Sequence, residues 1–193
     1  DRRPAVFEEM SGAQLYRHFN TMYATAYADI DLLPSLTING RYTYAYDHLK
    51  TEKYYDRSTS IGQSYKGQAF LSHEENVKHQ IEGVATYHPK MEGKHDVKVT
   101  AGTSYIYQRG KGDEVQAYGF ASDVFSFKNI GAAQHLDWIG SGESSIKKAS
   151  VFGRAEYIFN NRYIINASVR ADGSSVFGAD YRWGIFPAGS IAW

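Results

Sequence analysis

The feature that most constrains this chain is a strict alternation of apolar and polar residues. It recurs in six runs of about ten residues each, at 21–32, 36–46, 77–87, 96–107, 148–159 and 163–170, and a seventh extended run covers 185–193. This period predicts β-strands with one apolar and one polar face. The runs are longer than the five or six residues usual in soluble domains and match a tilted strand that crosses a bilayer.

The connections between these runs are alternately short and long. The short ones are turns at 33–35, 89–94 and 160–162, whereas two long polar stretches, 47–75 and 109–145, have no clear period. Short turns on one side and long loops on the other are typical of an outer-membrane barrel. We therefore predict an all-β fold, an antiparallel up-and-down transmembrane β-barrel segment of about seven strands. Residues 1–193 are expected to belong to one barrel domain, entered through a loop or short helical turn at 1–13, with the two polar stretches as extracellular loops.

Aromatic residues on the more apolar face favour a membrane location. Nine of them fall toward strand ends, where a membrane barrel carries its interfacial girdles: Tyr42, Tyr44, Tyr46, Tyr87, Tyr105, Tyr107, Tyr157, Phe159 and Tyr163. The polar face carries full charges: Asp29, Arg41, Lys78, Glu82, Lys98, Arg154, Glu156 and Arg170. Such a face lines the lumen of a wide barrel or faces water in a soluble β-sandwich, and alternation alone leaves both open.

In the barrel interpretation, each face of the last strand pair has a definite environment. We expect Val151, Ala155, Tyr157, Ile165, Ala167 and Val169 to face lipid, and Arg154, Glu156, Asn166 and Arg170 to face the lumen.

Composition excludes several other classes of protein. Lys and Arg number 21, as do Asp and Glu, so the chain lacks the basic surface that nucleic acids require. The absence of cysteine excludes a disulfide framework and a thiolate metal site. No run of about 18 apolar residues is present, so we expect no membrane-spanning helix.

The closing stretch, 170–193, contains a dense set of glycine, aromatic and polar residues: Arg170, Asp172, Gly173, Ser174, Ser175, Phe177, Gly178, Arg182, Trp183, Gly184, Phe186 and Pro187. With these residues the stretch resembles the SusC/RagA family of TonB-dependent outer-membrane transporters, and we expect them to be structural. Segments 157–170 and 30–36 also fit the family, the latter as a periplasmic turn. Ala171 and Ala188 are minor departures from its pattern.

The resemblance implies a barrel of about 22 strands, an N-terminal plug and a segment that contacts TonB. It further implies a SusD-like surface lipoprotein as a lid and the import of oligosaccharides or peptides across the outer membrane of Bacteroidota. Neither plug nor TonB box is visible in this sequence, and seven strands do not close such a barrel. We therefore expect a contiguous piece of the barrel wall that contacts outer-membrane lipid and the rest of the barrel. A passive outer-membrane channel and a soluble carbohydrate-binding sandwich are the alternatives.

No motif predicts covalent chemistry, so we expect neither an enzyme nor a cofactor. Ser144–Lys147 and Ser145–Lys148 match S-x-x-K but lack the partner motifs of that chemistry. The pairs Gly110/Gly112 and Gly140/Gly142 are expected to be loop tips rather than phosphate cradles, and 172–175 a strand-end turn.

Histidine placement also gives no metal prediction. The best candidates are His73 with Glu74 and Glu75, and His88 with His95 across a turn, and chance spacing explains both more simply than a metal site does.

Substrate contact is expected in the long polar stretches. The candidates are Tyr54, Tyr55 and Tyr65 in the first and Phe125, Phe127 and Trp138 in the second, which could stack on sugar rings or cover peptide side chains. The alternative is that they pack the loops together or against the lid protein.

Overall fold

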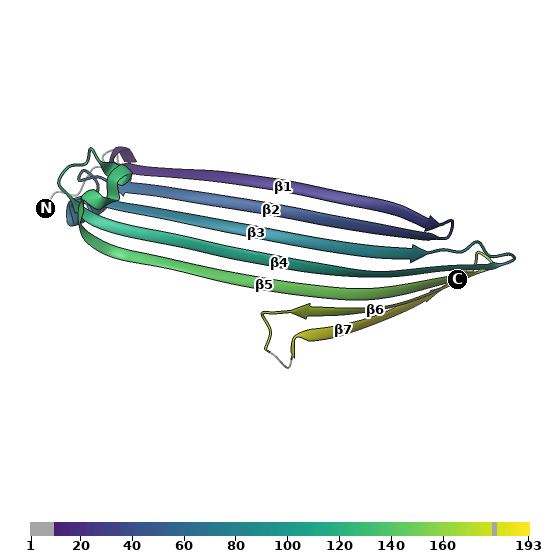
Figure 1. The fold of residues 1–193 in the computed structure, drawn as a ribbon. Coiled ribbons are helices and arrows are strands. Elements are labelled where there is room, and N and C mark those ends of the chain that lie inside the picture. Colours follow the sequence, from purple (N-terminus) through teal and green to yellow (C-terminus); the bar gives the residue numbers. More distant parts are fainter. Residues whose placement is uncertain (1–9, 179–180) are drawn as a thin grey trace. The chain divides into compact units, whose positions relative to one another are not determined.

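A computed structural model describes residues 10–178 and 181–193. These residues form one seven-stranded sheet in which each strand lies beside its neighbours in sequence (Figure 1). The strands are β1 (Ala13–Leu33), β2 (Leu36–Tyr55), β3 (Gln68–Tyr87), β4 (His95–Phe120), β5 (Ala133–Phe159), β6 (Tyr163–Ser174) and β7 (Trp183–Ala192), with helix α2 (Ser60–Tyr65) and the 3-10 helix η1 (Ser126–Ala132) between them. The predicted all-β meander is confirmed. A β-sandwich would need two sheets packed face to face, and the described residues form a single sheet.

The chain divides into two compact units. The first comprises the residues up to Met22, Tyr46–Val77 and Gly110–Ser144; the second comprises Tyr23–Ala45, Lys78–Arg109 and Ser145–Trp193. Of the predicted entry segment, residues 1–9 lie outside the described part of the chain and residues 10–12 are helical.

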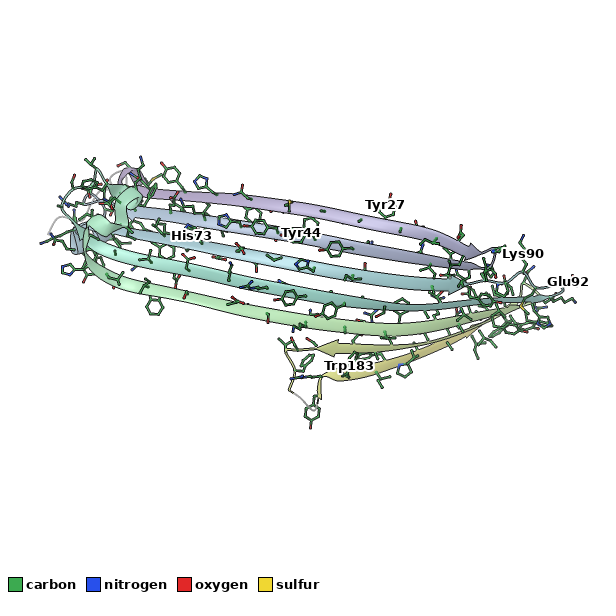
Figure 2. The ribbon with its side chains drawn as sticks, viewed as in Figure 1. Tyr27, Tyr44, His73, Lys90, Glu92 and Trp183 are labelled. Atoms are coloured by element: carbon green, nitrogen blue, oxygen red, sulfur yellow. The ribbon has the colours of Figure 1, made fainter. Side chains whose placement is uncertain are left out.

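The three short turns lie where the sequence predicts them. Two residues join β1 to β2, and seven join β3 to β4, where Figure 2 shows the side chains of Lys90 and Glu92. In the third turn Asn160 and Asn161 have φ of 54° and 52°, and the Arg162 N–H donates to the Phe159 carbonyl at 3.1 Å. This is the type I′ geometry that matches the twist of a hairpin, and asparagine tolerates its positive φ better than most residues.

The long connections are shorter than predicted. The polar stretches 47–75 and 109–145 are mostly strand, and only 56–67 and 121–132 connect the strands. The sequence conceals this because both faces are polar there, so hydropathy has no period although the backbone pairing continues. Cross-strand pairs accompany it: His73 Nδ1 lies 3.0 Å from Asp113 Oδ2, and Lys111 Nζ lies 3.4 Å from Glu75 Oε1.

The first unit contains the buried apolar cluster, formed by Tyr54, Ala69, Phe120 and Phe127. Tyr54 has no exposed surface, and its ring meets the edge of Phe120 at 5.4 Å between centroids. Its hydroxyl donates to Asp123 Oδ1 at 2.8 Å. Burial, together with this hydrogen bond, raises the pKa of the Tyr54 hydroxyl. The cluster therefore attaches the 121–132 connection to the ends of β2 and β4.

Gly67 allows the first connection to pass beside the same cluster. Its φ is 86°, and a Cβ there would lie 2.6 Å from the Tyr54 hydroxyl oxygen. Only glycine meets both conditions without strain. The backbone continues the attachment, since the Gly119 N–H donates to the Gly67 carbonyl at 3.1 Å and the Phe120 N–H to that of Lys66 at 2.9 Å.

Candidate functional site

The register of β5 and β6 sorts the side chains of the second unit into two faces. Ala155 pairs with Ala167 and Tyr157 with Ile165, whereas the adjacent pair, Glu156 with Asn166, points to the opposite side. The pairing therefore groups the side chains as the sequence predicts: Val151, Ala155, Tyr157, Ile165, Ala167 and Val169 on one face, and Arg154, Glu156, Asn166 and Arg170 on the other. Lipid contact by the first group stays a prediction.

The apolar face of this unit carries two aromatic belts, each with a histidine hydrogen-bonded to a tyrosine. In the first belt Tyr42 Oη lies 2.8 Å from His79 Nδ1, and the rings of Tyr44 and Tyr107 lie 5.2 and 6.3 Å from the His79 ring. Tyr44 is labelled in Figure 2. Tyr42 and Tyr44 lie on β2, His79 on β3 and Tyr107 on β4. The belt therefore crosses three strands, which is the arrangement of an interfacial girdle.

The second belt is built from β4, β5 and β6. His95 Nδ1 lies 2.7 Å from Tyr157 Oη. The Phe159 ring lies 5.1 Å from the His95 ring, and the Tyr163 ring lies 6.4 Å from the Phe159 ring, so the aromatic row continues onto β6. On β4, twelve positions separate His95 from Tyr107, about 41 Å along a strand and about 31 Å across a membrane at 40° tilt. This spacing is close to the ~30 Å hydrocarbon thickness of a bilayer.

The polar face of the same unit holds paired charges. Arg41 Nε donates to Glu82 Oε2 at 2.7 Å, and Arg170 Nε donates to both carboxylate oxygens of Asp172 at 2.8 Å. Arg154 donates to Asn166 Oδ1 at 3.0 Å. A face of this kind suits a hydrated lumen, where such groups keep their partners and their water.

Two glycines of the closing stretch lie close to aromatic rings. In the β6–β7 register Gly173 pairs with Trp183, and a Cβ at Gly173 would lie 2.8 Å from the indole. A Cβ at Gly184 would likewise lie 2.9 Å from the Phe186 ring. These contacts give a physical reason for glycine at 173 and 184, since a side chain at either position would clash with a ring.

The six aromatic residues expected to contact substrate do not form one site. Tyr54 and Phe127 belong to the buried cluster, and Tyr55 is half-buried at the end of β2. Tyr65 meets the edge of the Tyr118 ring at 5.2 Å, and Phe125 is exposed in the second connection. Trp138 lies on β5 rather than in a loop.

Trp138 lies in a groove of about 390 Å³ on the first unit. The groove is lined by Ser72, His73, Glu74, Gly112, Asp113, Glu114, Trp138, Gly140, Ser141 and Gly142, contributed by β3, β4 and β5. His73 is labelled in Figure 2. The indole N–H of Trp138 donates to Glu114 Oε1 at 2.7 Å, and 56% of the residue is exposed. Sequence analysis considered Glu74 only as a metal candidate and did not single out Glu114. It assigned the glycine pairs to loop tips, whereas they lie inside β4 and β5, and Gly112, Gly140 and Gly142 line the groove.

The remaining motifs are accounted for by strand structure. Ser144–Lys148 lies within β5. His88 Nε2 lies 2.7 Å from Asp96 Oδ1, whereas His95 contacts Tyr157, so the two histidines of the turn have different partners. In the described part of the chain, no helix has both the length and the apolar character needed to cross a bilayer.

Comparison with known proteins finds similarity to TonB-dependent receptors. No family model matches the chain. It is 25% identical over 177 residues to TonB-dependent receptor P3 of Formosa agariphila, covering 92% of this chain and 18% of that protein. It is 48% identical over 44 residues to TonB-dependent receptor SusC of Bacteroides thetaiotaomicron, covering 23% of this chain and 4% of that protein.

A solved structure shares the fold. The RagAB peptide transporter superimposes with a TM-score of 0.84 at 20% identity, over 93% of this chain and 20% of that chain. The sequence thus spans about a fifth of the length of the long relatives that it matches. The predicted resemblance to TonB-dependent receptors of the SusC/RagA family is confirmed, and the seven strands have the fold of a segment of such a β-barrel.

Proposed function

We propose that the chain forms part of the wall of an outer-membrane transporter that imports oligosaccharides or peptides with energy supplied through TonB. The observation that carries the proposal is the two-faced sheet of the second unit. Its apolar face has two aromatic belts about one bilayer apart, and its other face has paired charges. The sequence similarity to TonB-dependent receptors supports the energy-coupled mechanism over a passive channel.

Within this proposal the described residues bind and guide substrate and carry out no covalent chemistry. The arginine–carboxylate pairs line the lumen, where they stay hydrated, and the belts fix the depth of the strands in the membrane. A SusD-like surface lipoprotein is the proposed partner. The similarity to SusC and the two-component name of the RagAB transporter support that assignment.

Uptake measurements on cells that carry the intact transporter test the proposal. We expect accumulation of an oligosaccharide or peptide that requires the transporter gene, an intact TonB and a membrane potential. Deletion of the gene for the neighbouring lipoprotein should lower uptake at low substrate concentration. Uptake that persists without TonB or without a membrane potential would identify a passive channel instead.

A further inference from the structure

We propose that the Trp138 groove is a binding site for a neutral glycan, in which one sugar ring stacks on the indole. The inference rests on the proposed transport function and names the class of its substrate. It starts from the indole, which is exposed yet held in one orientation, because its N–H donates to Glu114 at 2.7 Å. A ring fixed in this way loses little conformational freedom when a ligand covers it, so more of the contact energy appears as affinity.

Glycine makes the platform flat. A Cβ at Gly140 would lie 3.0 Å from Trp138 Nε1 and 3.3 Å from Cε2, so a side chain there would push the indole away from the strand. Gly112 and Gly142 extend the same side-chain-free floor across β4 and β5. A pyranose ring is a flat object of similar width with C–H bonds on its faces, and it fits against an aromatic ring above such a floor.

The polar groups around the platform select hydroxyl-bearing ligands without negative charge. Glu74 and Glu114 present carboxylates, which accept hydrogen bonds from hydroxyl groups, and Ser72 adds a hydroxyl. Neither Lys nor Arg is among the described residues that line the groove. A uronate or sulfated sugar would therefore meet carboxylates without a compensating cation, which disfavours its binding.

A peptide fits this groove less well than a glycan does. The groove lies on β3, β4 and β5, which are interior strands with a neighbour on each side. Their backbone groups are committed to the sheet, so a peptide cannot bind by adding a strand, the mode in which peptides gain main-chain hydrogen bonds. The groups that the groove presents to a ligand are side-chain hydrogen-bond acceptors and one aromatic face, and these are the groups that bind sugars.

Calorimetric titration of the purified intact transporter with three panels tests this assignment: neutral oligosaccharides, oligouronates of the same length, and short peptides that include Lys and Arg. We expect a neutral oligosaccharide to bind and Trp138→Ala to weaken its binding about tenfold, the upper end of what one aromatic contact contributes. Trp138→Phe should retain most of the affinity. Gly140→Ala should weaken binding because it displaces the indole.

Ile139→Ala is the matched control, since Ile139 adjoins Trp138 in the strand, is 68% exposed and does not line the groove. The Ile139→Ala variant should bind the neutral oligosaccharide with the same affinity as the unmodified protein. Binding of only acidic glycans or only peptides, no binding by any neutral glycan, or binding indifferent to Trp138→Ala would each overturn the inference. These titrations need neither TonB nor a membrane potential, so a failure of the transport proposal would leave them interpretable.

Discussion

Placing an arginine at Ala167 tests which face of the sheet meets lipid. Ala167 is four positions from Tyr163 of the second belt, about 14 Å along the strand and about 10 Å in depth at 40° tilt. An apolar band ~25 Å tall has its midplane about 12 Å from either edge, so the substitution puts a charge near the centre of the membrane. There it should lower the free energy of unfolding by about 2–4 kcal/mol.

Ala188→Arg provides the matched control. Ala188 pairs with Ser168, so it lies on the next strand and on the face opposite to Ala167. An arginine there would point into the predicted lumen, and the expected cost is below about 1 kcal/mol. Ala167→Leu separates charge from size, because it enlarges the same position and should leave stability unchanged or raised.

Urea titration of the intact transporter folded into lipid vesicles measures these differences. The assignment of faces requires Ala167→Arg to be the destabilising member of the pair. If Ala188→Arg lowers stability by 2–4 kcal/mol while Ala167→Arg is neutral, the faces are reversed. Equal small effects would mean that neither face is buried in lipid.

Three smaller changes address the connections and turns. Tyr54→Phe keeps the ring but leaves Asp123 without its donor, so the 121–132 connection should lose about 1 kcal/mol and open more often in hydrogen exchange. The pKa of Tyr54 is raised in the folded protein, so its hydroxyl stays neutral there and keeps its hydrogen bond to Asp123. The stabilisation from this hydrogen bond is present below pH about 10 and is lost as pH rises above it. Limited proteolysis should show this pH-dependent loss of stability in the unmodified protein and not in Tyr54→Phe. Gly67→Ala should make the 56–67 connection sensitive to protease, because the new Cβ would clash with the Tyr54 hydroxyl. Gly93→Ala, at a φ of 93° but with open space around it, should cost only about 1 kcal/mol of stability. Similar protease sensitivity of the two variants would argue against the contact of residue 67 with Tyr54. Asn161→Val should cost about 1–2 kcal/mol and Asn161→Gly should be tolerated, as measured by urea titration, and the reverse order would exclude the type I′ turn.

The sequence predicts the strands of the second unit well because only one of their faces is apolar. Apolar residues at every second position, which a lipid-facing surface would require, mark these strands and their faces. The Asn160–Asn161 turn is predictable for a local reason, since few residues other than glycine and asparagine accept its dihedral angles.

The strand extensions and the groove escape sequence analysis for the opposite reason. Beyond Tyr46 and before Val77 both faces of the chain are polar, so continued backbone pairing leaves no period in the sequence. The groove depends on residues that three strands bring together, among them Glu74, Glu114 and Trp138, and their proximity follows from register. The Gly110/Gly112 and Gly140/Gly142 pairs were the available signal, and glycine within a strand indicates the close approach of another group as well as a turn.

The ordered connections bear on how a transporter of this kind could open. Residues 56–67 and 121–132 are what connects the strands within the stretches 47–75 and 109–145, which were expected to be long extracellular loops. In the structure the Tyr54–Asp123 hydrogen bond and the pairing of residues 119 and 120 with 66 and 67 attach them to strand ends. Opening either connection would expose the buried cluster and leave these backbone groups without partners, a cost of several kcal/mol. We therefore expect these two connections to move as fixed parts of the first unit during transport, and the rearrangement that admits substrate to occur in other parts of the transporter.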